Sequence, residues 1–548
     1  MRGSLQQVTE EMDTAFASTA FSPVICDAWD RASGIYDSSG DVVVQGVTGL
    51  PLFIGTMQFT VKAVLAVVED IAPGDVFIVN DPYAGGTHLM DVKMVAPIFH
   101  DAECILFLAN TGHWPDVGGR SPGGFTTQST DTFQEGVRIP PLRLIERGRV
   151  NSGLVELLLA NVRGLPRDRR GDIEAQLNAL ALGARRLEEV IGRYGWNTIQ
   201  RVIHELAARS ERLMREHIAA LPDGTYEASD FLDNDGIRPD PVRISLNLTI
   251  EGDEMHFDFS ATDPPTLGPF NAPLSTTLTS CYIAVKHIFP EIPINAGCFR
   301  PLKFNVPATT LLNPTFPRPV AGCTTEVPQR IIDVVFQALV QAAPERVPAS
   351  AFSTGSNYAI AGTDRVGAPF AFVNYTGGGY GGSAFEDGLI NGATTISVAR
   401  VASIEVLEQR FPVRYVRYGI REGSAGPGRH RGGFGTVVEV EMLCSEATFS
   451  LLGDRAHHAP RGALGGGPGA PARHTFFQSG IEWVPPSGAK VENLQLREGD
   501  RVLMETPGGG GFGDPSEREE ARVAADIKAG YLTAELAAAQ YGKAKKGG

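Results

Sequence analysis

The sequence is poor in cysteine, and the cysteines that it has are scattered. Its 548 residues include only six cysteines, and no two of them form a Cys-x-x-Cys pair. This pattern argues against a zinc ribbon and against a dense disulfide framework. We therefore expect reduced thiols that are mostly buried.

Positive charge is also scarce. The 48 Lys and Arg residues are outnumbered by 63 Asp and Glu, which gives a formal net charge of −15 at pH 7. Nucleic-acid binding draws most of its affinity from clustered basic side chains, and this sequence contains no basic stripe. A nucleic-acid partner is therefore not expected.

Long apolar runs and nucleotide-binding loops are missing as well. No uninterrupted apolar stretch reaches membrane-spanning length, and the N-terminal run MRGSLQQVTEEMDTAF lacks the charged-then-apolar pattern of a signal peptide. We expect a cytoplasmic protein with no membrane partner. No segment matches G-x-x-x-x-G-K-[ST], and no G-x-G-x-x-G opens a helix after a clear strand, so the chain is not expected to bind ATP itself.

What the sequence does contain is typical of a large globular protein. It is 43% hydrophobic and 20% charged, and it is long enough for two or more packed cores. Residues 4–20 have apolar positions near the helical period, residues 35–44 form a hairpin pattern around Asp37-Ser-Ser-Gly40, and residues 57–70 indicate a second helix. Residues 1–150 are thus predicted to be a mixed α/β region.

The rest of the chain changes pattern twice. Residues 151–222 are predicted to be helical, and residues 223–515 to be β-rich, with period-two stretches at 242–250 and 255–260. A helical tail is expected at 516–548. Overall the fold class is α+β. Glycine clusters at 377–382, 432–435, 465–469 and 508–513 indicate tight turns or close backbone packing.

One constellation in the first region suggests a metal. In Gly85-Gly-Thr-His-Leu-Met-Asp91, an imidazole and a carboxylate stand three residues apart on a loop that opens with glycine, and His113 lies in a second loop after the strand-like run 105–108. Two consecutive strand-to-loop junctions would bring both histidines to one sheet edge. Two imidazoles and one or two carboxylates with an open position suit catalytic zinc, and they also suit manganese or iron(II).

Three further aspartates are candidates near this constellation. Asp30 precedes the first hairpin and is a possible fourth ligand, while Asp81 and Asp116 are possible groups that orient the imidazoles. Asp81 and Asp116 are also good turn residues in their Asn-Asp-Pro and Pro-Asp-Val contexts. From the residues alone, a metal site and an ordinary set of polar loop residues both remain open.

Two other polar groupings favour structural interpretations. Glu326 and Arg330 are spaced for an i,i+4 helical ion pair. The segment Gly453-Asp-Arg-Ala-His-His458 contains a histidine pair that could suggest a second metal, but with only Asp454 nearby we expect a structural or interface role.

Several blocks, in order along the chain, resemble the hydantoinase B/oxoprolinase family. The runs NDPYAGGTHLMDV and NTGHWPDVGG are similar to the paired signatures of this family. Six later runs resemble further blocks of the same family: NVRGLPRDRRGDIEAQ (161–176), GPFNAP (268–273), INAGCFRPL (294–302), EVPQRIID (326–333), SAGPGRHRGGFG (424–435) and TPGGGGFGDP (506–515). In one respect the chain departs from the pattern, because Trp114 stands where many relatives have a second histidine after His113.

The resemblance implies a heteromeric enzyme. A hydantoinase A-type partner would use ATP to activate a lactam or ketone oxygen, while this type of subunit holds one divalent metal ion, which could be zinc, manganese or iron. Carried over by motif, the metal ligands are His88, Asp91 and His113, with Asp30 as a further acidic position.

Three functions follow as hypotheses. The first is the metal-bearing subunit of an ATP-dependent amidohydrolase that opens a hydantoin- or lactam-like cyclic amide. The second is a subunit of an ATP-dependent ketone carboxylase of the acetone or acetophenone type. The third is a scaffold subunit without catalytic residues. The sequence alone does not choose between a cyclic amide and a ketone as substrate.

Overall fold

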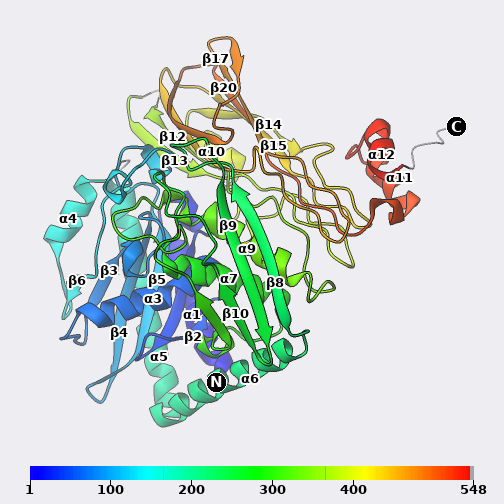
Figure 1. Cartoon of the computed structure of the whole chain (residues 1–548). Helices are drawn as coiled ribbons and strands as arrows, with labels where there is room; N and C mark the ends of the chain where they lie inside the picture. Colours follow the sequence, from blue (N-terminus) through cyan, green and yellow to red (C-terminus); the bar gives the residue numbers. More distant parts are fainter. Residues whose placement is uncertain (164–165, 365, 543–548) are drawn as a thin grey trace.

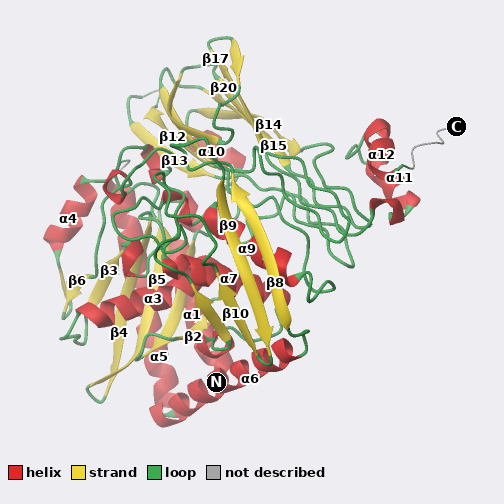
Figure 2. Ribbon diagram, viewed as in Figure 1, coloured by secondary structure: helices red, strands yellow, loops and turns green. Residues whose placement is uncertain are grey.

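The computed structural model describes residues 1–163, 166–364 and 366–542. The end of the expected helical tail, 543–548, and positions 164–165 of the block 161–176 lie outside these ranges. Figures 1 and 2 show a broad body of helices and sheets, with a sheet-rich upper part and a pair of C-terminal helices set apart from it. Within the described ranges, every helix is too short or too polar to cross a membrane.

The first sheet carries the candidate metal site. Its seven strands run in the order β2-β1-β5-β4-β3-β6-β7. The expected hairpin at 35–44 is present as β1 and β2. The strand bounds are β1 Arg31–Asp37, β2 Val42–Gln45, β3 Val76–Val79, β4 Asp91–His100, β5 Glu103–His113, β6 Leu142–Glu146 and β7 Arg149–Val150.

Helices cover both faces of this sheet. The Asn110 side chain on β5 points to the face that α1 and α5 cover, because it donates to the Gln176 backbone oxygen in α5. Lys93 on the neighbouring strand β4 donates to Thr56 in α3. Because successive side chains alternate between faces, these contacts place α3 opposite α1 and α5. The helix bounds are α1 Arg2–Thr19, α2 Pro23–Cys26, α3 Pro51–Val67, α4 Ser152–Ala160, α5 Pro166–Tyr194 and α6 Trp196–Ala219.

A second layered unit packs against α3. Helix α7 contacts α3 and α9, and α9 lies on β8 and β9 of a four-stranded sheet ordered β11-β10-β9-β8. The sequence pattern predicts strands in this part of the chain but misses the buried helix α7. The bounds are β8 Gly224–Leu232, β9 Val242–Glu251, β10 Glu254–Asp258, β11 Leu302–Asn305, α7 Leu274–Ile288, α8 Ala296–Phe299 and α9 Val327–Leu339.

Two further sheets form the upper part of the body in Figure 2. Their orders are β13-β12-β16-β19 and β14-β15-β20-β17-β18, and they share an apolar core that includes Phe449 and Val440. The bounds are β12 Asn357–Thr363, β13 Pro369–Asn374, α10 Ile404–Arg410, β14 Val413–Ile420, β15 Thr436–Met442, β16 Ala447–Leu452, β17 Arg473–Gln478, β18 Ile481–Trp483, β19 Lys490–Leu496 and β20 Arg501–Glu505.

The glycine clusters form a bundle of extended segments that leads toward α11 (Glu520–Lys528) and α12 (Ala534–Tyr541). The segments bond to one another through backbone groups: Gly433 N donates to Tyr380 O, and Gly509 N donates to Gly433 O. A Cβ on either glycine would overlap a backbone oxygen of a neighbouring segment. The expectation of close backbone packing is therefore confirmed.

The α+β fold class is also confirmed, as is the helical nature of α4, α5 and α6 and of the described part of the tail. All six cysteines are free, and four of them are buried. The expected helix at 57–70 begins earlier, at Pro51, because a proline at the first helical position suits the chain entering the helix.

Candidate metal centre

The candidate ligands come from the ends of two adjacent strands. Asp91 is the first residue of β4, His113 is the last residue of β5, and the two are paired across the antiparallel ladder. His88 lies in the turn that leads into β4. The sequence predicted that the candidate ligands lie on two loops. For Asp91 and His113 this is wrong, because the β4–β5 ladder extends as far as these two residues.

The three side chains converge on one point. His88 Nε2 lies 2.8 Å from Asp91 Oδ1, and His113 Nδ1 lies 3.1 Å from the same oxygen and 3.2 Å from His88 Nε2. All three residues are buried. Within the described ranges, they make up the one group of at least three His, Cys, Asp or Glu side chains whose ligand atoms meet in this way.

The geometry fits a divalent ion. Two ligand atoms that each lie about 2.0–2.1 Å from a tetrahedral zinc are roughly 3.3 Å apart, close to the three separations in this cluster. The donor set of two imidazole nitrogens and one carboxylate oxygen is also the set that zinc, manganese and iron(II) accept. His113 Nε2, the ring nitrogen that does not face Asp91 and His88, is buried and has no hydrogen-bond partner in the described structure.

Electrostatics support a charged Asp91. Burial raises the pKa of the Asp91 carboxyl, but His88 and His113 lower it more, and the result is a pKa well below the usual range. Asp30 behaves differently. Its Oδ2 lies 3.8 Å from His113 Nδ1, and burial, with a smaller contribution from Asp91, raises its pKa to about 7. Asp30 is therefore next to the triad but is not part of its tight cluster.

Two threonines hold the ligands in place. Thr324, just before α9, forms a 2.8 Å hydrogen bond with His88 Nδ1, which leaves His88 Nε2 facing the cluster. Thr87 donates to Asp91 Oδ2. Such partners fix the orientation of a ligating ring or carboxylate. Neither threonine stands out in the sequence, because the residue type is common and Thr324 is far from His88 along the chain.

The aspartates expected to orient the imidazoles have other partners. Asp81 caps the short helix at Pro82–Ala84 and pairs with Arg138, while Asp116 accepts hydrogen bonds from the Gly118 and Gly123 amides and from Arg163. Neither is bonded to His88 or His113. Their alternative interpretation as turn residues is the correct one.

An apolar cavity of about 90 Å³ adjoins the triad. His88, His113 and Asp30 are among its polar lining residues, and its walls come from distant segments, among them Phe53 at the start of α3 and Phe372 on β13. The cavity thus lies where the first sheet meets the upper sheets. Apolar lining with a few convergent polar groups is typical of small-molecule sites.

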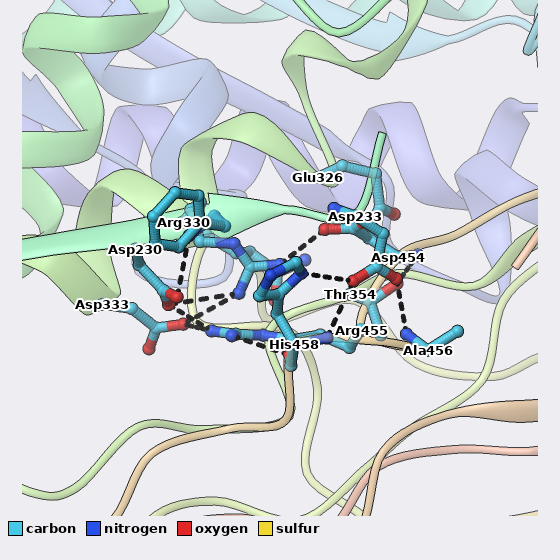
Figure 3. A network of polar contacts seen from close by, with 12 residues as sticks. Asp230, Asp233, Glu326, Arg330, Asp333, Thr354, Asp454, Arg455, Ala456 and His458 are labelled. Carbon is cyan, nitrogen blue, oxygen red and sulfur yellow. Dashed lines mark hydrogen bonds and ion pairs between the residues drawn. The ribbon is translucent and has the colours of Figure 1, made fainter. Parts of the chain in front are cut away.

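A second buried polar cluster joins α9 and β8 to the segment that follows β16 in the upper sheets (Figure 3). Arg330 on α9 donates to Asp454 at 2.7 Å and lies near Asp230 and Asp333, while Arg455 pairs with the same two carboxylates. The predicted Glu326–Arg330 ion pair is wrong. Glu326 stands at the N-cap of α9 rather than inside the helix, and its carboxylate accepts from the Gly355 amide.

Of the histidine pair near this cluster, His458 contacts protein side chains, and a structural or interface role stays the expectation for the pair. His458 Nδ1 lies 3.1 Å from Asp233, and the His458 ring stacks on Phe231. Asp454, the acidic neighbour in sequence, instead accepts from Arg330 and from Lys490 at 2.9 Å. The carboxylates of this cluster are therefore engaged by cationic side chains and backbone amides.

The fold and the site define a mixed α/β protein with a candidate two-histidine, one-carboxylate metal centre beside an apolar cavity. A family model, hydantoinase B/oxoprolinase, matches residues 1–515, and the chain therefore belongs to the hydantoinase B/oxoprolinase family.

Relatives and solved structures agree with this membership. The chain is 31% identical to the B-type subunit of a putative D-/L-hydantoinase from Pseudomonas sp. (strain NS671), over 98% of this chain and 93% of the relative. It is also 31% identical to the beta subunit of caprolactamase from Pseudomonas jessenii, with 99% and 94% covered.

The crystal structure of the ATP-dependent caprolactamase from Pseudomonas jessenii superposes with a TM-score of 0.91 at 29% identity, covering 100% of this chain and 96% of that one. The nucleotide-free acetone carboxylase structure has the same TM-score at 21% identity, with 98% and 78% covered, and shares the fold.

Proposed function

We propose that this chain is the metal-bearing subunit of an ATP-dependent amidohydrolase that opens a hydantoin- or lactam-like cyclic amide, with ATP used on a hydantoinase A-type partner. The observation that carries the proposal is the convergence of His88 Nε2, His113 Nδ1 and Asp91 Oδ1 beside an apolar cavity. The relatives named as components of a hydantoinase and of a caprolactamase support the substrate class and the heteromeric assembly.

His88, Asp91 and His113 would hold the ion, and Asp30 is the candidate for a further ligand. A divalent ion bound there would polarise a carbonyl or phosphoryl oxygen and make water acidic enough to attack at neutral pH. Thr324 would keep the His88 ring turned so that Nε2 faces the ion, and Thr87 would do the same for the Asp91 carboxylate. The apolar walls of the cavity would keep bulk water from the reacting group.

Use of ATP on the partner is supported by the glycine-rich segments. Phosphate-binding loops need backbone amides that face an open space. In the bundle, the glycines at 508–511 instead have neighbouring backbone within the space that a Cβ would take, and their amides donate to other segments. The bundle is filled by its own chain, which leaves no cradle for a phosphate there.

A ketone carboxylase subunit is the second candidate. The observation that favours it is the apolar wall around the triad, which would accept an alkyl or aryl ketone as readily as a lactam. A scaffold subunit without catalytic residues is the third, and it is the least consistent with a ligand cluster that opens onto a cavity.

One experiment tests all three. The chain is co-purified with its hydantoinase A-type partner and assayed against lactams, hydantoins and ketones, with ATP and bicarbonate varied independently. The proposal predicts ring opening that needs ATP but not bicarbonate, and no ATP hydrolysis by this chain alone. Bicarbonate-dependent turnover of a ketone would instead establish the carboxylase. Full activity of His88→Ala in an intact complex would leave only the scaffold.

A further inference from the structure

The cavity beside the triad contains buried polar atoms that have no partner. Tyr375 OH, Thr325 Oγ1 and Asn357 Nδ2 line the same cavity as His113 and have no hydrogen-bond partner in the described structure. The Asn357 side chain is almost wholly buried, with 5% of its surface exposed. Buried polar groups are nearly always bonded, so unbonded ones that face a cavity indicate a ligand or water that completes them.

The cavity lining contains a carboxylate but no permanently cationic side chain among the described residues. Among the described residues, its lining includes the carboxylate of Asp30 and the two histidines but neither lysine nor arginine. A carboxylate on a substrate would therefore be buried near Asp30 with no lysine or arginine side chain to pair with, and burying an unpaired carboxylate costs several kcal/mol in proteins.

The body of the cavity is apolar and partly aromatic. Phe372 stacks on Phe411 at a ring distance of 4.4 Å, and Phe125 stacks on His113 at 5.9 Å. All of these rings line the cavity, together with Leu52 and Ile396. Such walls suit a ring of methylene or aromatic carbons, because apolar surface gains most from leaving water.

Resting on the proposed function, we infer that the substrate is an uncharged carbonyl compound with an apolar body and no carboxylate, and that Asn357 is a specificity-determining residue that donates to its oxygen. An amide N–H donates and a carbonyl oxygen accepts. Tyr375 and Thr325, whose hydroxyls both donate and accept, would bond a second polar group such as a lactam N–H. A carboxylate-bearing ring such as 5-oxoproline is excluded.

A matched pair of probes tests the inference. 2-Pyrrolidinone and 5-oxoproline share one lactam ring and differ by a carboxylate. Binding of each to the full chain is measured by calorimetry, with and without added zinc or manganese, alongside ε-caprolactam and acetophenone. We expect the neutral rings to bind and 5-oxoproline to bind at least about tenfold more weakly, as a buried unpaired charge requires. Equal or tighter binding of 5-oxoproline overturns the inference, as does failure of every neutral ring to bind at millimolar concentration.

Variants separate the cavity from the rest of the surface. Asn357→Ala should weaken binding of the neutral rings by about tenfold, the usual effect of losing one buried hydrogen bond to a ligand. Asn305→Ala, on the exposed face of β11, should leave binding unchanged. Ala371→Arg, which adds a cation to the lining, should shift the preference toward 5-oxoproline. Unchanged probe binding in both Asn357→Ala and Ala371→Arg contradicts the assignment.

The outcomes also distinguish this inference from the proposed function. Neutral rings that bind in the cavity but are never turned over by the complex would remove the amidohydrolase and leave the binding preference intact. Turnover of a carboxylate-bearing lactam with ATP would support the amidohydrolase and overturn the preference for uncharged substrates.

Discussion

Asp91 and His113 are partners in the antiparallel ladder, at the start of β4 and the end of β5. Backbone pairing of two ten- and eleven-residue strands fixes these two candidate ligands before any ion binds. Sites that are built on strands are held more rigidly than sites on loops. The centre is therefore expected to be preorganised, and its metal should matter more to turnover than to folding.

Chelation tests this expectation directly. Removing the metal from the assembled enzyme should abolish activity, while the circular dichroism spectrum is kept and the melting temperature changes by no more than about 5 °C. The reason is that an open catalytic site leaves the apolar cores untouched. If the metal-free chain instead unfolds or separates from its partner, the centre is structural.

Metal content tests the ligands themselves. The purified chain should contain about one transition-metal ion by elemental analysis, and His113→Ala should lose most of it because one of three converging donors is removed. His256→Ala, on the exposed part of β10, serves as the control and should keep the ion. Equal content in His113→Ala and the unmodified chain would contradict the site.

Thr324 should affect metal binding without touching the metal. Thr324→Val keeps the size of the side chain but removes the hydrogen bond to His88 Nδ1. Loss of such a partner typically weakens metal affinity by about 10- to 100-fold. Competition with a chromogenic chelator measures this, and Thr324→Ser should restore the affinity. The exposed Thr309→Val provides the control, and an equal loss there would show that the effect is not specific.

The buried ion cluster should govern stability. Arg330→Met removes one buried cation that Asp230 shares with Arg455 and Asp454 shares with Lys490, and it should cost about 3–5 kcal/mol in the free energy of unfolding, measured with urea. Arg300→Met removes an exposed pair with Glu211 and should cost under about 1 kcal/mol. Similar losses of unfolding free energy in Arg330→Met and Arg300→Met would mean that the buried cluster does not stabilise the contact between α9 and the upper sheets.

Glu326 should make stability depend on pH. Burial, with a smaller contribution from Asp454, raises the pKa of its carboxyl from 4.5 to about 8. A raised pKa means that the folded state holds the proton more tightly, so this group's contribution is complete below about pH 4.5 and is lost as the pH rises to about 8. Above pH 8, Glu326→Gln should therefore unfold at a higher urea concentration than the unmodified chain. Its free energy of unfolding should be larger by roughly 1–4 kcal/mol. Parallel pH profiles for the two proteins would refute this titration.

The candidate ligands can be predicted because they are close in sequence. His88, Asp91 and His113 lie on or beside two neighbouring strands of one sheet, so spacing and strand patterns bring them together. Thr324 cannot be found in this way, because it is 236 positions from His88 and reaches it only when the segment before α9 packs against the first sheet. Likewise, Asn357 enters the cavity from the upper sheets, a contact that no local pattern encodes.

The errors have equally specific causes. The sequence pattern misses helix α7 because its buried face is built from threonines and serines as well as apolar residues, which hides the helical period. The Glu326–Arg330 pair is predicted from i,i+4 spacing, but that rule applies only where both residues are inside the helix. At the N-cap, Glu326 turns to the Gly355 amide, and Arg330 faces three aspartates from other turns and segments.

The glycine bundle limits how this protein can change during evolution. At Gly379, Gly433 and Gly509, the atoms that would obstruct a Cβ belong to the backbone of neighbouring segments rather than to side chains. Trimming a neighbouring side chain cannot make room there, since every residue type carries the same backbone. Substitutions at these positions should therefore have no second-site suppressors among the contacting residues, unlike substitutions in the apolar cores, where one side chain can shrink as another grows.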